Sequence, residues 1–206
     1  IRNGNEEIVI TVNVTTQLEL QPTQLTVFEN DRVTVPVTPH GATDALLPGP
    51  WQLIAAGASD GLRCSVAENS DTTKSVTIQS GPVTRETQEA VNLHYKYAHG
   101  GTGYEGSSAV TVTVMPQPEV VEVSPNDLWT MDFSGYDGLI LTKVEVSNGG
   151  AQVTITEGNK TLNIMKKPLF QGTEIPLEIT LTDKDGLEHT LTNTITIQIP
   201  PPGPTP

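Results

Sequence analysis

Short runs of alternating apolar and polar residues recur along almost the whole chain, and this recurrence restricts the fold more than any other feature. QLTVFE from Gln24, RVTVPV from Arg32 and AVTVTV from Ala109 are examples, and Gly, Pro, Asn and Asp gather between such runs. Alternation with a period of two places every second side chain on one face of an extended strand. Many short strands with turn residues between them are typical of β-sandwiches and β-barrels. The sequence therefore predicts an all-β fold.

Three connections in the second half of the chain carry residues suited to tight hairpins. They are Asn148–Gly150, Gly158–Asn159 and Asp185–Gly186. Gly and Asn tolerate the positive φ that two-residue hairpin turns demand. We expect antiparallel strand pairs on either side of each connection, with Gly186 at positive φ.

A break between two series of strands falls at Pro116 and Pro118. A chain of 206 residues is long enough for two domains, because domains commonly contain about 100–150 residues. The sequence predicts two tandem immunoglobulin-like antiparallel β-sandwiches, residues 16–116 and 118–200, followed by a Pro-rich linker at 201–206. We expect residues 118–201 to fold by themselves and the two prolines to limit hinge motion.

The segment 1–15 carries one more alternating run, with Ile8, Ile10, Val12 and Val14 on one face. It resembles the Thr-rich runs that close the two predicted modules. Two interpretations stay open: a strand of a truncated upstream module, or an added edge strand of the first sandwich. An unpaired edge tends to find a partner, so we expect this strand to pair. Both ends of the chain are interpreted as parts of a longer string.

The run PLEITLTDKDGLEHTLTNTITIQI from Pro176 resembles the final hairpin of bacterial immunoglobulin-like modules found in secreted and cell-surface proteins of the Bacteroidetes type. This resemblance implies an extracellular or cell-surface location beside carbohydrate-processing or adhesive domains. Other domains of the same parent protein are then the expected partners. Antibody-type domains pair two cysteines beside a tryptophan. Cys64 is the only cysteine, so Trp51 has no such disulfide beside it.

The charge of the chain disfavours two classes of partner. The formal net charge is −13, with 11 Lys and Arg residues. Nucleic-acid binding needs a basic surface that neutralises phosphates, so nucleic acid is not an expected partner. The sequence contains no apolar run of the ~20 residues that cross a bilayer as a helix, so we expect no membrane insertion.

Catalytic and metal-binding patterns are missing from the sequence. His40, His94, His99 and His189 are scattered, and no Cys-x-x-Cys or His-x-x-x-His spacing brings ligands together. A Gly-x-Ser-x-Gly nucleophile motif is also missing. The Asp183 to Glu188 segment has carboxylates for calcium, but too few to fill its coordination sphere, so a plain turn is favoured. We expect no enzyme activity, no cofactor and no metal.

Aromatic residues gather in two places. Tyr95 and Tyr97 share one face of a strand, and Tyr104 follows in a Gly-rich segment that is interpreted as a loop. The other cluster, Trp129, Phe133 and Tyr136, begins the second module. Core packing is the favoured interpretation for Tyr95, Tyr97, Trp129 and Phe133. The candidate ligand-binding residues are Tyr104, Trp129 and Tyr136.

The predicted function follows from the module architecture and the missing catalytic motifs. A non-catalytic structural spacer or interaction module of a larger bacterial surface or secreted protein is the first hypothesis. The alternative is a glycan-binding or adhesive module that uses exposed aromatic residues, with a glycan or a protein as ligand. Scarce aromatic residues, 4% of the chain, favour the first.

Overall fold

The structure is a computed structural model that describes residues 2–3, 6–7, 19–40, 51–70, 73–99, 102–156 and 158–198. In these ranges the regular elements are all strands, which confirms the predicted all-β fold. A search of the same ranges finds no helix with the length and hydropathy of a membrane span.

The first sandwich packs a four-stranded sheet on three strands. The four-stranded sheet has the order β4–β11–β10–β7, formed by β4 (Gln24–Phe28), β11 (Thr102–Met115), β10 (Thr87–His99) and β7 (Trp51–Ala58). The facing strands are β5 (Asp31–Pro36), β9 (Lys74–Ser80) and β8 (Leu62–Asn69). One pairing departs from the predicted antiparallel pattern, because β4 runs parallel to β11. Val33, Ile78 and Val112 are among the side chains buried between the layers.

The second sandwich repeats this plan with shorter strands. One sheet has the order β12–β13–β16–β15, formed by β12 (Val121–Ser124), β13 (Leu128–Asp132), β16 (Thr161–Lys166) and β15 (Ala151–Thr156). The facing strands are β14 (Ile140–Val146), β17 (Glu174–Thr182) and β18 (Glu188–Thr196). Trp129, Met131, Ile164 and Ile179 are buried between them. The predicted tandem immunoglobulin-like sandwiches are therefore present.

Two small pairs of strands complete the described elements. β3 (Glu19–Gln21) pairs with β6 (Thr38–His40), and β1 (Arg2–Asn3) pairs with β2 (Glu6–Glu7), both antiparallel. The predicted strand from Ile8 to Val14 lies outside the described residues, as does the Pro-rich segment 201–206. The predicted pairing of the first segment and the predicted linker at the second therefore stay predictions.

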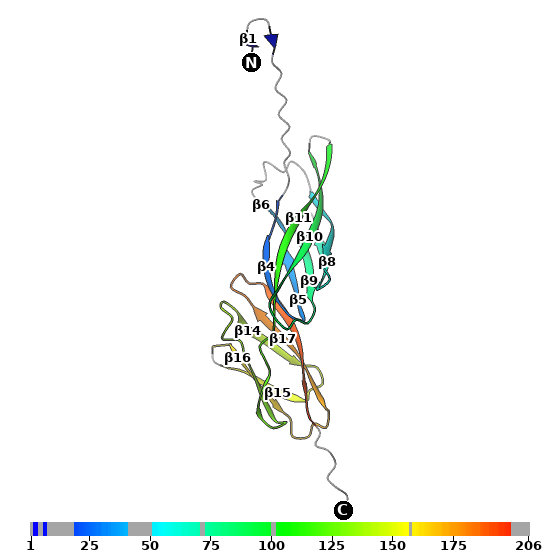
Figure 1. The fold of residues 1–206 in the computed structure, drawn as a ribbon. Helices are drawn as coiled ribbons and strands as arrows, with labels where there is room; N and C mark the ends of the chain where they lie inside the picture. Colours follow the sequence, from blue (N-terminus) through cyan, green and yellow to red (C-terminus); the bar gives the residue numbers. More distant parts are fainter. Residues whose placement is uncertain are drawn as a thin grey trace, which may run out of the picture.

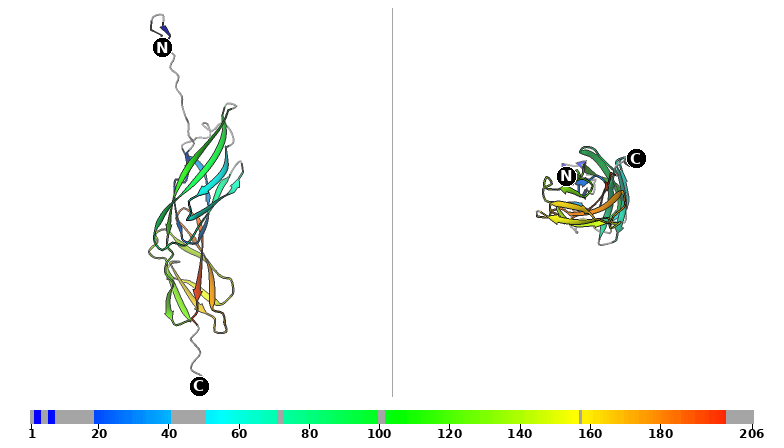
Figure 2. Two further views of the ribbon diagram at one scale, coloured as in Figure 1. Left: turned by 45° about the vertical axis from the view of Figure 1, so that its right-hand side comes forward. Right: turned by 90° about the horizontal axis from the view of Figure 1, so that it is seen from below.

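The two sandwiches share one sheet, which the sequence did not predict. β18 of the second sandwich pairs antiparallel with β5 of the first through His189–Val33, Thr190–Arg32 and Leu191–Asp31. The result is a six-stranded sheet in the order β14–β17–β18–β5–β9–β8. Figure 1 shows the sandwiches end to end with β17 close below β5, and the view along the long axis in Figure 2 shows them overlapping in a narrow outline.

The buried apolar side chains form two clusters, one in each sandwich, and some side chains cross between the sandwiches. The partly buried Met115 packs against the second cluster and Leu187 against the first, and the fully buried Phe28 is the largest side chain that crosses. Val27 and Phe28 are consecutive residues at the end of β4, and alternation points their side chains in opposite directions. Val27 enters the first core and Phe28 enters the second core. The second core is thus completed by a side chain from the first module. Folding of 118–201 alone remains a prediction, and that fragment lacks this ring.

The predicted turn residues have the expected backbone. Gly149, Gly158, Asn159 and Gly186 lie at φ of 64°, 66°, 63° and 80°. The connections at Gly158–Asn159 and Asp185–Gly186 join antiparallel neighbours, β15 with β16 and β17 with β18. The predicted hairpin at Asn148–Gly150 is wrong, because this turn leads from β14 in one sheet to β15 in the other. The prediction of positive φ at Gly186 is confirmed.

Gly186→Val should lower the free energy of unfolding by about 1–3 kcal/mol, because a β-branched residue is strained at positive φ. No heavy atom lies within 4 Å of the position where a Cβ would be built, so the cost is conformational rather than steric. Urea denaturation measures the change. Gly57→Val is the control: Gly57 also has free space around it but lies in strand β7 without a positive φ. Equal costs for the two variants would contradict the explanation.

Phe28→Ala should destabilise the second sandwich by about 3–5 kcal/mol, the usual cost of removing a buried Phe side chain. Trp129 lies in the second core, so its fluorescence in a Trp51→Phe background reports unfolding of that sandwich. Leu25→Ala, on the same strand but packed against the first core, should lower the free energy read by Trp129 by less. A larger effect from Leu25→Ala would show that Phe28 does not belong to the second core.

Candidate functional site

A buried carboxylate at the start of β5 organises the boundary between the two sandwiches. Asp31 is 1% exposed. Its Oδ1 accepts a hydrogen bond from Thr190 N at 3.0 Å, and its Oδ2 accepts one from Phe28 N at 3.3 Å. Asp31 N donates to Ser80 Oγ at 3.0 Å. Nδ1 of His189 lies 2.6 Å from Oδ2. One residue therefore ties β4, β9 and β18 together.

His189, the second residue of β18, is 2% exposed and is held from three sides. A carboxylate has no proton to give, so the imidazole Nδ1–H donates to Asp31. The edge of the ring meets Phe28, with 6.0 Å between the ring centroids. Nε2 lies 3.9 Å from Oδ2 of Asp183. The imidazole is thus fixed between two carboxylates, one from each side of the module boundary.

Asp183 also closes the turn that precedes β18. Its Oδ1 accepts hydrogen bonds from the backbone N–H groups of Asp185 and Leu187, at 2.9 and 2.8 Å. Local side-chain bonds of this kind are typical of Asp in turns. Among the described residues, no group of three or more His, Cys, Asp or Glu side chains is placed to hold a metal ion.

Gln117, between the two linker prolines, bonds to both sandwiches. Its Nε2 donates to the carbonyl oxygens of Glu29 at 2.8 Å and Thr192 at 3.1 Å. Its Oε1 accepts from Nδ2 of Asn193 at 3.0 Å, and its backbone N donates to Oε1 of Glu29 at 3.0 Å. The side chain is buried. The linker is therefore fixed by a satisfied amide as well as by its prolines.

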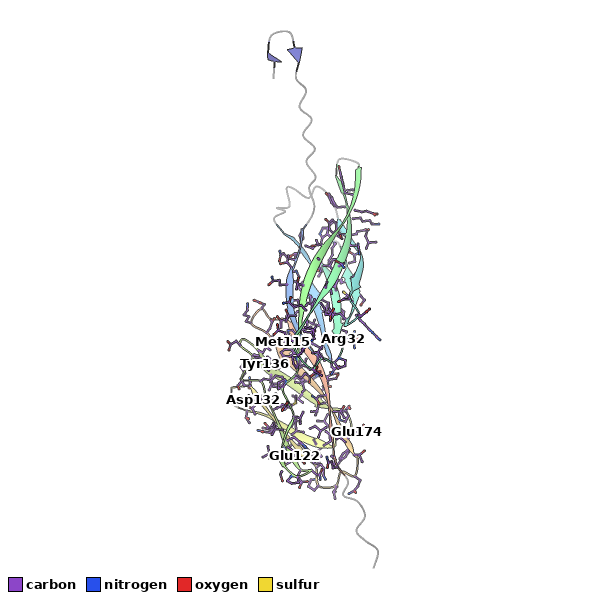
Figure 3. All side chains as sticks on the ribbon, in the orientation of Figure 1. Arg32, Met115, Glu122, Asp132, Tyr136 and Glu174 are labelled. Carbon is purple, nitrogen blue, oxygen red and sulfur yellow. The ribbon has the colours of Figure 1, made fainter. Side chains whose placement is uncertain are left out.

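Tyr136, one of the sequence-predicted ligand-binding residues, lies at this junction. Its hydroxyl donates to the carbonyl of Pro116 at 3.0 Å, and its ring meets Phe28 edge-on with centroids 5.1 Å apart. Burial, together with the negative charge of Glu29, raises the pKa of Tyr136. Figure 3 places Tyr136 beside Met115 at the module boundary. The ring therefore serves packing between the modules.

Two hollows flank the junction. One of about 880 Å³ is lined by Tyr136, Asp183 and His189 together with the outer side of β4 and β11. The other, of about 900 Å³, lies beside Arg32 and Glu178 on the shared sheet. Both are open to solvent and are lined by residues of the two sandwiches.

Trp129, another of the sequence-predicted ligand-binding residues, lies in the second core. It lies in β13, opposite Ile164 of β16, and is 4% exposed in the second core. A ring in that position has no free face for a ligand, so the core interpretation is correct. Trp129, Met131 and Phe133 occupy alternate positions, and this period of two was the signal for an inward-facing strand.

Tyr104 lies at the far end of the first sandwich, in β11 rather than in a loop. It is directly opposite Tyr97 of β10, and the two rings stack with centroids 5.1 Å apart and an interplanar angle of 16°. Tyr95 lies behind Tyr97, with a centroid distance of 6.3 Å. Tyr95 is buried, whereas Tyr104 is 43% exposed. The structure thus brings together the three tyrosines of the first aromatic cluster.

The register of the sheet adds a fourth aromatic residue that sequence reasoning had not grouped with them. Trp51 of β7 is opposite Tyr97 on the other side, so Trp51, Tyr97 and Tyr104 form one row across three strands. Nζ of Lys74 lies 4.8 Å from the centre of the Trp51 ring. No local pattern links Trp51 with Tyr97, since only strand pairing makes them neighbours.

The remaining predicted residues lie apart. His94 is exposed on β10, far along the chain from the His189 junction, and the side chains of His40 and His99 lie outside the described residues. Cys64 of β8 is half-buried against the first core, and burial raises the pKa of its thiol to about 11. A thiol with this pKa is a poor nucleophile near neutral pH.

Comparisons with known proteins find similar folds at low identity. No protein-family model and no curated protein sequence matches the chain. An endo-fucoidan hydrolase of glycoside hydrolase family 107 is 12% identical with a TM-score of 0.32; the alignment covers 84% of this chain and 27% of that one. Cadherin domains 1–4 of protocadherin gamma B7 are 8% identical, with a TM-score of 0.31 and coverages of 88% and 50%. The Ig1–2 module of the Drosophila receptor protein tyrosine phosphatase DLAR is 12% identical, with a TM-score of 0.30 and coverages of 88% and 96%.

The chain therefore spans about a quarter and half of the length of the first two of these structures. TM-scores near 0.3 carry no argument about activity or ligands.

Asp31→Asn should lower the free energy of unfolding by about 1.5–3 kcal/mol, the contribution of a hydrogen bond to a charged group. Asn keeps the size of the side chain but places an NH₂ group against one of the three N–H donors that Asp31 now satisfies. Urea denaturation provides the measurement. Asp137→Asn makes the same chemical change at an exposed position and should leave stability unchanged. Equal stability of both variants would remove Asp31 from the centre of the junction.

Proposed function

We propose that this chain is a non-catalytic spacer that holds neighbouring domains of its parent protein at a fixed separation and orientation. The observation that carries this proposal is the shared sheet: β18 and β5 join the two sandwiches by backbone pairing. We further propose a bacterial, secreted or cell-surface setting, supported by the resemblance of the closing hairpin at residues 176–199 to modules from such proteins.

The energetics of the junction favour a stiff unit. Interfaces between domains of one chain are commonly small and polar, and relative motion is then the default. Here bending would separate β18 from β5 and withdraw Phe28 from the second core. It would also leave Asp31 and His189 without their partners, and unpaired buried groups cost free energy. Gln117 opposes the same motion from the linker side.

The buried Asp31–His189 pair supports a structural rather than a catalytic role. In a Ser-His-Asp arrangement the serine hydroxyl bonds to the imidazole nitrogen that faces away from the carboxylate. The hydroxyl of Ser80 instead donates to the carbonyl oxygen of Phe28 and accepts from Asp31 N. The Nε2 atom of His189 faces the Asp183 carboxylate. The pair therefore holds strands together.

A second candidate function is favoured by one specific observation. Tyr104 is a stacked, substantially exposed ring at the end of the molecule opposite to the second sandwich. Figure 1 shows the β10–β11 hairpin rising above the neighbouring strands. A spacer does not need an exposed ring at its end, whereas an adhesive or glycan-binding module does.

Distance measurements between spin labels test the spacer proposal. The labels are placed at His94→Cys in the first sandwich and Leu169→Cys in the second, both exposed positions, in a Cys64→Ala background. A stiff connection should give one narrow distance distribution by double electron–electron resonance. The double variant Asp31→Asn/Gln117→Ala should broaden it, and Asp137→Asn should not. A broad distribution in the otherwise unaltered chain would reject the proposal.

A further inference from the structure

We propose that the face of Tyr104 turned away from Tyr97 is a stacking site for one sugar ring of a neutral glycan. This inference names the ligand class for the second candidate function and rests on it. The spacer role depends on the junction at the other end of the first sandwich. Failure of one proposal therefore leaves the other in place.

The Tyr104 ring is fixed before any ligand arrives. It stacks on Tyr97, which in turn stacks on the buried ring of Tyr95. Tyr95 fits because residue 106, opposite it on β11, is Gly: a Cβ there would lie 2.5 Å from the Tyr95 hydroxyl oxygen. A ring held in this way loses little rotamer freedom on binding. The stack therefore supplies a preorganised flat surface.

The position of Tyr104 in the sheet leaves one ring face open. β10 lies on one side of β11. On the other side β4 pairs along Thr111–Met115, and Leu20 of β3 donates its backbone N–H to Oγ of Ser108. Within the part of the chain that the structure describes, no strand pairs with β11 beside Tyr104 on that outer edge. The 43% exposure of Tyr104 agrees with this arrangement. A flat apolar group can therefore approach the ring from the edge of the sheet.

A pyranose ring matches this surface in shape and polarity. One face of many hexoses is a flat array of C–H groups, which gains dispersion contacts and buries apolar area on an aromatic ring. Gln52, Lys96 and Glu105 line a hollow near Tyr97 and Tyr104. They form the next row across the three strands, so alternation directs their side chains to the opposite face of the sheet from the aromatic row. The surface that Tyr104 offers is therefore the apolar ring itself.

Charge selects a neutral glycan over an anionic one. The chain carries a formal net charge of −13, and a uniformly charged polyanion is repelled by such a field. Lys96 and Glu105, on the opposite face of the sheet, are paired directly across β10 and β11, so their charges balance. The field of the whole chain therefore disfavours uronates and sulfates as ligands.

A proline-rich peptide is the other class of ligand that aromatic rings bind, but the geometry disfavours it. Polyproline segments dock into grooves between aromatic side chains. Tyr97 and Tyr104 stack against each other with 5.1 Å between centroids, so no groove separates them. One open ring face suits one sugar ring better than a ridged helix.

Affinity electrophoresis of the whole chain tests the inference, with hydroxyethyl cellulose, galactomannan or alginate in the gel. We expect at least one of the two neutral polymers to retard the protein and the anionic alginate to leave it unretarded. Tyr104→Ala should weaken retardation by about tenfold or more in affinity, equivalent to about 1.4 kcal/mol. Tyr104→Phe keeps the ring and should retain binding. Ile54→Ala, which removes another exposed apolar side chain from the same sheet, is the matched control and should also bind.

Fold and ligand class are checked in the same experiment. Thermal unfolding shows whether Tyr104→Ala is folded, and Tyr104→Leu provides a second ring-free variant that keeps apolar bulk. The inference is overturned if neither neutral polymer retards the protein, if alginate alone does, or if both ring-free variants bind as well as the unaltered chain. Displacement of the protein from the neutral polymer by a peptide of residues 199–206 would assign the site to proline-rich segments and overturn it as well.

Discussion

The arrangement of this molecule depends on how one buried carboxylate is satisfied. A carboxylate removed from water is costly unless donors surround it. Asp31 receives donors from β4, from β18 and from the His189 ring, while its own N–H is bonded to β9. The donors from Thr190 and His189 are available only when the start of β18 lies against the start of β5. The polar requirement of one residue therefore fixes how the sandwiches meet.

Apolar packing and backbone pairing reinforce the same geometry. Alternation along β4 directs the Phe28 side chain into the second core, where its ring contacts Tyr136 and His189. Pairing between β18 and β5 joins one three-stranded layer of each sandwich into a single six-stranded sheet. Gln117 closes the linker side with bonds to both sandwiches. Because these contacts share residues, loosening one exposes the others, and this coupling is the physical basis of the proposed stiffness.

The three aromatic residues that the sequence offered for ligand binding have different roles because their burial differs. Trp129 fills the second core, Tyr136 bridges the two modules through Pro116 and Phe28, and Tyr104 ends a stack with one open face. Trp129 and Tyr136 therefore serve packing. The third lies at the end of the molecule away from the junction, so stiffness and recognition occupy separate places on the chain. Such separation suits a module that presents a surface at a set distance.

Local features of the sequence determined the strands, the turns and the all-β fold. Alternation acts over a few residues, and positive φ at Gly149, Gly158 and Gly186 follows from the turn residues themselves. The inward side of β13 was also readable, since Trp129, Met131 and Phe133 alternate. Tertiary structure alone decided the contact of Asp31 with His189, 158 residues apart, the crossing of Phe28 into the second core and the row of Trp51 with Tyr97 and Tyr104. Backbone preferences specify which residues form a strand and which face is apolar, but the partner of an edge is chosen by burial and hydrogen bonding between distant segments once both sandwiches exist.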